Sequence, residues 1–499
     1  MRPKSLSKTR LFFLLLFALL VAARMCHIDI LWAEETLPLA AAQQMRAGQV
    51  LYRDIWFDKP PLAPMLYAAL GVEAGWRLRL AGALYALLCC WIAWGFARDL
   101  WGRREGLWAA GLLGFFLIFD FPSSAIPLAA DLLMLAPHLA AVWMAYQRRP
   151  LWAGALAGVA FAISPKGVLV LAVCAWWAPS WALLAGFAGI AGAASAWMWS
   201  AGALAGYWDE VWRWGRVYAG TTFVDAPLKN GLLRTLNWAG FHAAIVVAAV
   251  EQASRTLGMG LGPARSHEER WGMLQLASRP EGRPCRWFFD PVHAERRRWL
   301  VWLLLSVAGV LAGLRFFPRY YFQILPVVVL LAARGFAGMR GRRRWVALLL
   351  LIPLARFAPT YYMAARDAGW RDTAMDRDSR AAAAMVSALA KPGDTLFVWG
   401  FRPEIYVYSH LPAATRFLDS QPLTGVPADR HLTQSTPVET RESRARRAEL
   451  AASRPTFVVD GLGEYNRRLA ITQFPDLRAW MAAYREVGRS AGSVIYQRE

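Results

Sequence analysis

Acidic and basic side chains gather in one short stretch directly after the first hydrophobic segment of the chain. Glu34 and Glu35 stand together before an apolar-rich segment, and Asp58 and Lys59 follow that segment, next to the paired prolines at 60–61. Charges this close to a membrane span are costly to bury, so they usually serve an ion, a substrate or a proton. The stretch therefore predicts a chemical site at a membrane surface.

The two adjacent glutamates are candidates for a catalytic base. Partial desolvation beside a membrane span makes a carboxylate a better proton acceptor, which suits it to deprotonate a hydroxyl group. The structural alternative is an ordinary acidic pair at a helix N-terminus, stabilised by the helix dipole. Glu34 and Glu35 both stay open as the base at this point.

Three cationic positions are candidates for holding a phosphate group. Prolines fix the backbone directly after Lys59, and a lysine near the interface suits a phosphate as a point charge. Lys166 lies at a break between two apolar runs. Arg319, followed by Tyr320, begins a late hydrophobic segment, where an arginine can grip phosphate oxygens through two N–H groups. The structural alternatives are lipid-headgroup contacts and an interfacial belt of arginine and aromatic side chains.

Asp131 stands alone in an apolar sequence and is a further acidic candidate. An isolated carboxylate beside a span needs a partner or a function, although an N-cap of the following helix accounts for it almost as well. The histidines and cysteines share no metal-ligand spacing. Asp58 is therefore the one candidate ligand for a divalent cation, and such a cation stays optional.

Composition indicates a polytopic membrane protein. The chain is 57% hydrophobic with 26 tryptophans in 499 residues, and long apolar runs recur up to about residue 360. A bilayer-spanning helix needs about 20 residues. Judged against that length, a mainly α membrane domain over residues 1–362 is expected to hold about eleven transmembrane helices, near residues 11–24, 76–97, 107–121, 131–147, 151–165, 167–180, 181–203, 235–251, 299–314, 319–336 and 343–360.

Arginine-rich segments give the expected orientation. They lie at residues 98–104, 147–149, 254–298 and 334–344. With eleven spans and a cytoplasmic N-terminus all four fall on the cytoplasmic side, as the positive-inside tendency requires. Residues 252–298 then form a basic cytoplasmic loop, whereas the acidic first loop at 25–75 and the C-terminal region lie outside. The net charge of +21 then reflects loop arginines facing anionic lipid, and no nucleic acid is expected as a partner.

A small extracytoplasmic α/β domain is expected over residues 363–499, because the texture changes there to mixed polar and apolar sequence. The expected strands lie at 394–400, 456–460 and 493–497, and the expected helices at 403–409, 439–453 and 474–487. The domain has no Gly-rich phosphate motif, so it is not expected to bind a nucleotide. It is expected to pack over the external mouth of the membrane domain, with a role in acceptor recognition as the alternative.

The first loop resembles that of the GT-C membrane glycosyltransferases, in the ArnT-like and protein-mannosyltransferase-like branch, which take sugars from polyprenyl phosphates. The matching positions are Glu34, Glu35, Thr36, Ala42, Met45, Asp58, Lys59, Pro60, Pro61 and Leu62. The resemblance implies that the first acidic residue, Glu34, is catalytic. The family more often has aspartate there, and the extra methylene group leaves the choice between Glu34 and Glu35 open.

The resemblance also implies roles for the scattered charged positions. Asp131 corresponds to the acidic residue of the second external loop, and Lys59 and Arg319 to groups beside the donor phosphate, with Tyr320 and Lys166 as further candidates. We therefore expect a glycosyltransferase, inverting by family, of the bacterial inner membrane, acting at its external face. Its partners would be a polyprenyl-phosphate-linked sugar and a lipid, glycan or protein acceptor. A transporter or flippase of lipid-linked sugars and a non-catalytic scaffold are the alternatives.

Overall fold

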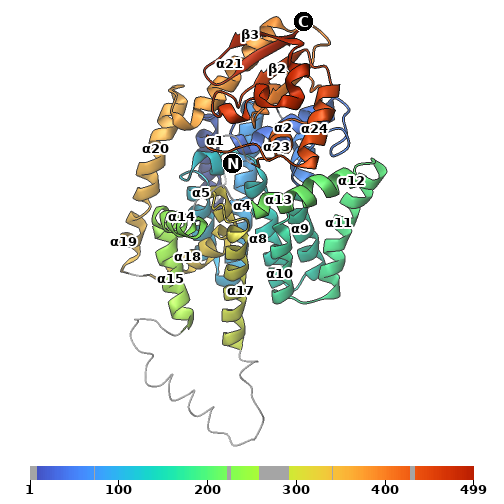
Figure 1. The fold of residues 1–499 in the computed structure, drawn as a ribbon. Coiled ribbons are helices and arrows are strands. Elements are labelled where there is room, and N and C mark those ends of the chain that lie inside the picture. The colour runs from blue at the N-terminus through green and yellow to red at the C-terminus, as the bar shows by residue number, and fades with distance from the viewer. Residues whose placement is uncertain (1–7, 72, 222–225, 258–290, 340, 428–432) are drawn as a thin grey trace, which may run out of the picture.

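The structure is a computed structural model that describes residues 8–71, 73–221, 226–257, 291–339, 341–427 and 433–499. A helical body carries a small domain with a β-sheet at one end, drawn in orange and red in Figure 1. Most of the expected basic loop, residues 258–290, lies outside the described residues.

Helices occupy all eleven segments in which spans were expected. They are α1 (Lys8–Met25), α4 (Trp76–Trp101), α5 (Arg103–Phe116), α7 and α8 (Ala130–Leu133, Leu135–Tyr146), α9 (Pro150–Ile163), α10 (Gly167–Trp177), α11 (Trp181–Ser200), α14 and α15 (Pro227–Phe241, Ala243–Leu257), α17 (Pro291–Leu311), α18 (Leu325–Gly338), and α19 and α20 (Arg343–Leu348, Leu351–Ala365). The short elements between them are α2 (Ala33–Arg46), α3 (Leu62–Leu70), α6 (Pro122–Ala125), α12 (Leu204–Tyr207), the π-helix η1 (Trp208–Arg213), α13 (Trp214–Gly220) and the 3-10 helix η3 (Pro318–Gln323).

Three described helices are long and apolar enough to cross a bilayer by themselves: Trp76–Trp101, Trp181–Ser200 and Arg343–Ala365. One bent pair meets the same test together, and four shorter apolar helices lie beside them. The protein is therefore a helical membrane protein, while the number of eleven crossings stays a prediction.

The expected span over residues 235–251 is not one straight helix. α14 and α15 meet at His242 and bend by 92°. The buried His242 ring stacks between Phe116 and Trp238, each at 4.5 Å between ring centroids. Its Nε2 atom also lies 3.3 Å from Asp120 Oδ2. This non-local contact fixes a corner that hydropathy cannot reveal, because the apolar run at 235–251 continues through His242 without a break.

The C-terminal sheet has four strands in the order β1-β2-β4-β3. They are β1 (Leu396–Trp399), β2 (Phe457–Asp460), β3 (Tyr484–Arg489) and β4 (Val494–Arg498), with β1 parallel to β2 and the other two pairs antiparallel. The helices of this domain are α21 (Ala374–Leu389), α22 (Glu404–Ser409), α23 (Gln421–Thr424), α24 (Arg441–Ala452) and α25 (Arg478–Met481), with 3-10 turns at Arg371–Thr373, Arg467–Leu469, Ile471–Gln473 and Pro475–Leu477.

Most of the expected C-terminal elements are present, but the expected helix over residues 474–487 is wrong. That segment holds a 3-10 turn and the single turn of α25, and it then enters β3 at Tyr484. β3 pairs with β4 in an antiparallel hairpin that starts with Tyr484 opposite Arg498. The pairing with a partner strand outweighs the weak helical preference of a short segment.

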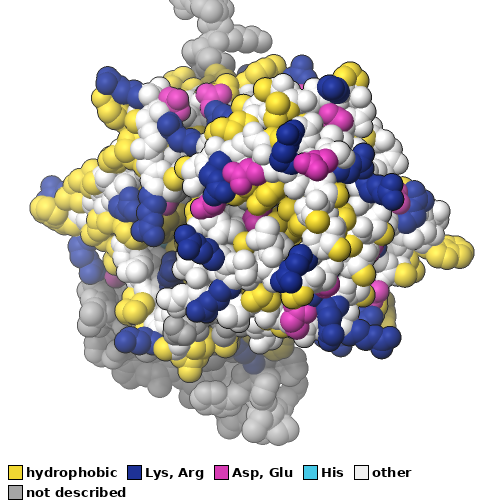
Figure 2. All heavy atoms as spheres, turned by 45° about the horizontal axis from the view of Figure 1, so that its top comes forward, with side chains coloured by type: hydrophobic (Ala, Val, Ile, Leu, Met, Phe, Trp, Pro, Cys, Tyr) yellow, Lys and Arg dark blue, Asp and Glu magenta, His cyan; other side chains and the backbone are white. Residues whose placement is uncertain are grey.

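The C-terminal domain docks on the first loop and on η1. Its contacts there are Leu31 N–H donating to Asp376 Oδ1 at 3.1 Å, Ala413 N–H donating to Gln44 Oε1 at 3.0 Å, Trp56 N–H donating to Arg416 O at 2.8 Å, and an ion pair between Arg416 and Glu210. Figure 2, which brings this end of the molecule forward, shows acidic and basic side chains interspersed on its outer face. The domain therefore covers the first loop and presents a mixed polar surface.

Candidate active site

The two neighbouring glutamates lie in the first turn of α2 and take different surroundings. Glu35 is fully buried. Arg79 of α4 donates to both of its oxygens, at 2.6 Å to Oε1 and 3.1 Å to Oε2, and the Trp32 N–H donates to Oε1 at 3.0 Å. Arg79 also donates to the carbonyl of His27 at 3.0 Å. This arrangement, the Glu35–Arg79 pair, holds α2 against α4 and leaves Glu35 no free face.

Glu34 turns the other way and meets charged side chains from distant parts of the chain. Its Oε1 atom lies 2.5 Å from Arg319 Nη1, and Arg319 Nε lies 3.4 Å from Asp131 Oδ2. Asp131 Oδ1 in turn lies 4.0 Å from Lys166 Nζ. Each of these side chains keeps between 16% and 20% of its surface exposed, so the group is accessible at one side.

The charged cluster is defined as Glu34, Asp58, Lys59, Asp131, Lys166 and Arg319. Lys59 Nζ lies 3.7 Å from Asp58 Oδ1. Burial by itself would lower the pKa of Lys59, but the Asp58 and Glu34 carboxylates raise it overall, so this lysine stays cationic at neutral pH. The structure thus brings together all the predicted site residues except Glu35, with Tyr320 packed against them.

A tight loop holds Lys59 in place. The Tyr52 hydroxyl donates to the Lys59 carbonyl at 2.6 Å, and Tyr52 itself has a φ of +66°. A positive φ at a bulky residue costs energy and persists where the surroundings fix it. Here the Tyr52 ring is buried against Tyr207 at 5.2 Å between centroids, and Asp54 accepts from the Val50 N–H at 2.9 Å.

Lys166 sits in the turn between α9 and α10. The turn is close enough that a Cβ atom on Gly167 would lie 2.2 Å from the Phe161 backbone nitrogen, so glycine is required there. The Lys166 ammonium stands 3.6 Å from the centroid of the Tyr320 ring, a cation–π geometry. Burial lowers the pKa of Lys166 to about 8, against the opposing effect of Asp131.

In the segment from Arg315 to Tyr321, Arg319 belongs to the charged cluster, and Arg315 holds the neighbouring backbone in place. Arg315 donates to the carbonyls of Tyr218 and Thr221, at 2.8 and 2.6 Å, and stacks on the Tyr218 ring at 3.6 Å. Tyr218 also comes within 3.5 Å of the Tyr320 hydroxyl. Arg315 therefore anchors the end of α13 beside the cluster. Sequence reasoning missed Tyr218 because nothing in its own neighbourhood marks it.

No group of three His, Cys, Asp or Glu side chains is close enough to hold a metal ion within the described residues. Asp58, the predicted ligand, faces the Lys59 ammonium instead. A divalent cation at this position would take most of its ligands from water or from substrate phosphate oxygens, as Mg²⁺ commonly does.

An apolar groove of about 900 Å³ lies near the loop that carries Lys59 and the turn that carries Lys166. Pro61 lines it two residues after Lys59, Phe161 lines it beside the Lys166 turn, and Tyr207 lines it against Tyr52. Its remaining walls come from α11, α12 and η1, including Trp199, Trp208 and Trp212. The site therefore has an apolar groove near a cluster in which both charge signs meet.

Comparisons with known proteins identify the fold. No family model matches the chain, and no curated protein matches its sequence. Among solved structures, the crystal structure of ArnT from Cupriavidus metallidurans bound to undecaprenyl phosphate aligns over 98% of this chain and 97% of its own, with 14% identity and a TM-score of 0.57. Its apo form aligns over 98% of both chains with a TM-score of 0.55. The Archaeoglobus fulgidus oligosaccharyltransferase in complex with Zn and sulfate is a weaker match, with 13% identity, 96% and 73% coverage and a TM-score of 0.49.

The chain thus has the fold of the GT-C superfamily of membrane glycosyltransferases, and the predicted resemblance is confirmed at the level of the fold. At this identity the likeness concerns architecture, because fold alone does not fix chemistry. The roles of the charged cluster rest on its own geometry.

Proposed function

We propose that this protein is a membrane glycosyltransferase that moves a sugar from a polyprenyl-phosphate donor to a hydroxyl group of a lipid, glycan or protein acceptor. The observation that carries the proposal is the position of Arg319, which bridges Glu34 and Asp131 in the same charged cluster as Lys59. An apolar groove lies near this cluster and begins two residues after Lys59, at Pro61. Transfer from a polyprenyl phosphate needs cations for the phosphate, a carboxylate as the base and an apolar surface for the polyprenyl chain. These three features lie near one another here. The undecaprenyl phosphate bound to ArnT, which shares the fold, supports this donor class.

Lys59 and Arg319 are proposed to hold the donor phosphate. Lys59 supplies a point charge, and Arg319 supplies several N–H donors in a planar fork. Lys166 and Tyr320 would complete the cationic side of the pocket, since the ammonium already rests on the Tyr320 ring. The isoprenoid chain would then run from Pro61 into the apolar groove.

Glu34 is the proposed catalytic base, with Asp131 orienting the acceptor. The acceptor oxygen would attack the anomeric carbon while the bond from that carbon to the phosphate oxygen breaks. The hydroxyl proton passes to the carboxylate, and the polyprenyl phosphate leaves with the electron pair. Attack from the face opposite the phosphate inverts the anomeric configuration. Arg319 and Lys59 stabilise the charge that grows on the departing phosphate.

Donor binding itself would prepare the base. Arg319 is engaged by Glu34 at 2.5 Å and by Asp131 at 3.4 Å. A phosphate competes with these carboxylates for the same guanidinium. Glu34 would then be released to accept a hydrogen bond from the acceptor hydroxyl, which ties the reactive state of the base to the presence of substrate.

The C-terminal domain, residues 363–499, is proposed to narrow the access of the acceptor. It reaches the loop that carries Lys59 through the Trp56 N–H, which donates to Arg416, and it reaches η1 through the Arg416–Glu210 ion pair. We propose that an acceptor passes these two contacts on its way to the charged cluster. The orientation that follows from the arginine-rich segments puts this domain outside a bacterial inner membrane and the N-terminus in the cytoplasm.

The test is an assay for release of polyprenyl phosphate, the product common to every acceptor. The full chain in lipid nanodiscs would be incubated with a panel of polyprenyl-phosphate sugars and with a total membrane extract as the acceptor source. We expect release from at least one donor, and a loss of at least 100-fold in Glu34→Gln. Lys391→Ala, a change at an exposed lysine far from the cluster, is the control with wild-type activity. Equal release by Glu34→Gln and the wild type would overturn the assignment of the base. In sealed proteoliposomes, movement of intact lipid-linked sugar across the bilayer without release of polyprenyl phosphate would favour a flippase.

A further inference from the structure

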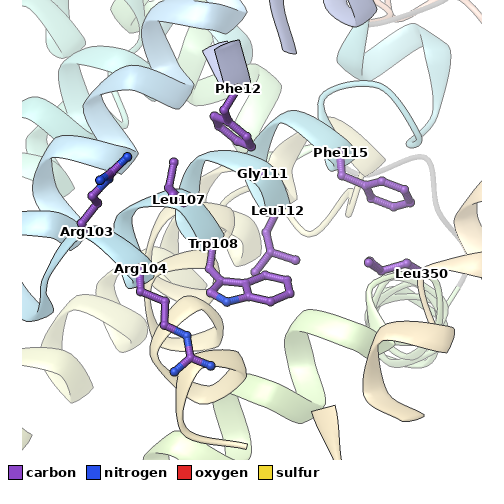
Figure 3. A pocket seen from close by; sticks show the side chains of 9 residues that line it. All are labelled: Phe12, Arg103, Arg104, Leu107, Trp108, Gly111, Leu112, Phe115 and Leu350. Carbon is purple, nitrogen blue, oxygen red and sulfur yellow. The ribbon is translucent and has the colours of Figure 1, made fainter. Parts of the chain in front are cut away.

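A second pocket, of about 610 Å³, lies at the other end of the helical body. It is bounded by α1, α5 and the helix formed by α19 and α20. The side chains that line it are drawn in Figure 3: two arginines, Arg103 and Arg104, stand at one end, and apolar side chains continue from there along α5 toward Phe115 and Leu350. Contacts place this end away from the charged cluster, because Arg103 reaches Thr9 at the start of α1, whereas Glu34 follows the end of that helix.

The two arginines carry charge that no described carboxylate neutralises. Arg103 donates to the Thr9 hydroxyl from Nε at 3.1 Å and from Nη2 at 2.7 Å, which fixes its side chain between α1 and α5. Glu105, the nearest acid in the sequence, is engaged by Arg334 at 2.7 Å. Arg98, the next basic residue upstream, is engaged by Asp99 at 2.9 Å.

The remaining wall of the pocket is apolar and opens toward lipid. Phe12, Leu107, Trp108 and Leu112 line it. The neighbouring leucines on the outer face of α1 are about half exposed, as expected of side chains that contact hydrocarbon. From Arg103 to Phe115 the pocket runs about 18 Å along α5, at 1.5 Å per residue. This length is similar to that of an extended acyl chain of a phospholipid.

We propose that this pocket binds one anionic phospholipid, with its phosphate at Arg103 and Arg104 and an acyl chain along Phe12 and Trp108. Basic pockets between transmembrane helices are a known means of holding anionic headgroups. The positive end of the α5 dipole, which begins at Arg103, adds to the attraction. This inference is independent of the proposed transferase activity, because it concerns a different end of the molecule.

The charged end and the apolar end of the pocket together decide between the possible occupants. A free phosphate would satisfy the arginines but leave the apolar wall uncovered. A zwitterionic phospholipid would fill the wall and bring a phosphate, but its headgroup cation would compete with the two arginines for that phosphate and leave them without a net counter-charge. An anionic phospholipid matches both ends.

The test is native mass spectrometry of the full chain in detergent, titrated with dioleoyl phosphatidylglycerol or with dioleoyl phosphatidylcholine. Because the acyl chains are identical, the comparison isolates the headgroup. We expect one retained phosphatidylglycerol, bound at least tenfold more tightly than phosphatidylcholine. Equal binding of the two lipids would overturn the proposal, as would displacement by glycerol phosphate at the concentration that displaces whole lipid.

Three variants locate the site. The double change Arg103→Gln and Arg104→Gln should lower phosphatidylglycerol binding at least fivefold. Gly111→Leu should do the same by filling the pocket, because a Cβ atom there meets Phe12 at an ordinary 3.7 Å and a longer side chain extends into the space. The double change Arg343→Gln and Arg344→Gln removes equal charge without touching the pocket lining, and should leave binding within twofold. Equal losses in the pocket and control variants would contradict the site.

A measurement on the unaltered protein covers the case in which a variant does not fold. A phosphatidylglycerol with a photoreactive group in its acyl chain would be bound to the wild type and activated. We expect the label on peptides from α1 and α5. Labelling confined to other helices would overturn the proposal.

Discussion

Glu34 and Glu35 are adjacent in the chain but form different ion pairs. Glu35 forms a closed pair, which is buried with Arg79, whereas Glu34 forms an open pair, which is partly exposed, with Arg319. In the Glu35–Arg79 pair both carboxylate oxygens accept hydrogen bonds and both partners are buried. In the charged cluster Arg319 is shared between two carboxylates, and its side chain is 20% exposed. The closed pair has no capacity left for a ligand, whereas a phosphate can replace a carboxylate on Arg319.

The difference shows that of two neighbouring charged residues, one can stabilise the fold while the other stays available to bind a ligand. Consecutive residues on a helix point about 100° apart, so an acidic pair at a helix start addresses two environments. Here Glu35 faces Arg79 of α4 and Glu34 faces Arg319. A buried pair that loses one partner is destabilised, while an accessible pair that exchanges one partner can work as a site.

The largest expected effect is a loss of turnover when Glu34 is replaced. Glu34→Gln keeps the shape of the side chain and removes the base, so turnover should fall by about 10²–10⁴-fold, the range for general base catalysis. The fold should persist, because Glu34 is not enclosed. Polyprenyl phosphate release under single-turnover conditions, together with the thermal unfolding midpoint, measures both properties. A variant that keeps wild-type turnover would remove Glu34 from the mechanism.

The next largest effect is a loss of folding stability when Glu35 is replaced. Glu35→Gln leaves Arg79 as a buried charge without its carboxylate, which should cost about 3–5 kcal/mol. The measurement is the thermal midpoint and the monodisperse yield in detergent, with Glu34→Gln as the matched control at the neighbouring position. Unchanged stability of Glu35→Gln alongside lost activity would reverse the roles proposed for the pair.

A smaller effect probes the geometry of Arg319. Arg319→Lys retains the charge but loses the planar fork of N–H donors. We expect donor affinity to weaken about tenfold, or about 1.4 kcal/mol, with the midpoint of unfolding nearly unchanged. Binding isotherms for the same donor in nanodiscs measure this. Affinity equal to the wild type would mean that Arg319 acts as a point charge or does not contact the phosphate.

The smallest effect concerns pH and Lys166. Its pKa is lowered to about 8 by burial, so the ammonium loses its proton as the pH rises through that value. If the cation helps to hold the donor, KM should rise about threefold between pH 7 and pH 9, which reflects partial loss of one of three cations. Lys166→Arg stays charged over this range and should flatten the alkaline rise. The same rise in both proteins would assign it to another group.

The structure brings together the charged positions that the sequence singles out, while their role as an active site stays a prediction. Asp58, Lys59, Asp131, Lys166 and Arg319 were found because charges in apolar sequence are rare enough to stand out. Their three-dimensional neighbours stayed hidden. Arg79 closes on Glu35 across 44 residues, a separation that no local pattern encodes.

The errors in the fold have the same origin. His242 turns the expected span at 235–251 into two helices through its contacts with Phe116 and Asp120, which are distant in the chain. Residues 484–489 form a strand because β4 offers a partner. Strands with strongly apolar sequences, such as Leu396–Trp399, are predicted directly, because a short run of apolar residues indicates a strand that is buried on both faces.

The central claim is that a polyprenyl phosphate sits between Lys59 and Arg319. The most direct measurement is the affinity of undecaprenyl phosphate, without sugar, for the wild type and for the double variant Lys59→Ala and Arg319→Gln in nanodiscs, with Lys391→Ala as control. We predict that the double variant loses at least 100-fold in affinity, while Lys391→Ala and the unfolding midpoints stay close to the wild type. Equal affinity in all three proteins would contradict the account.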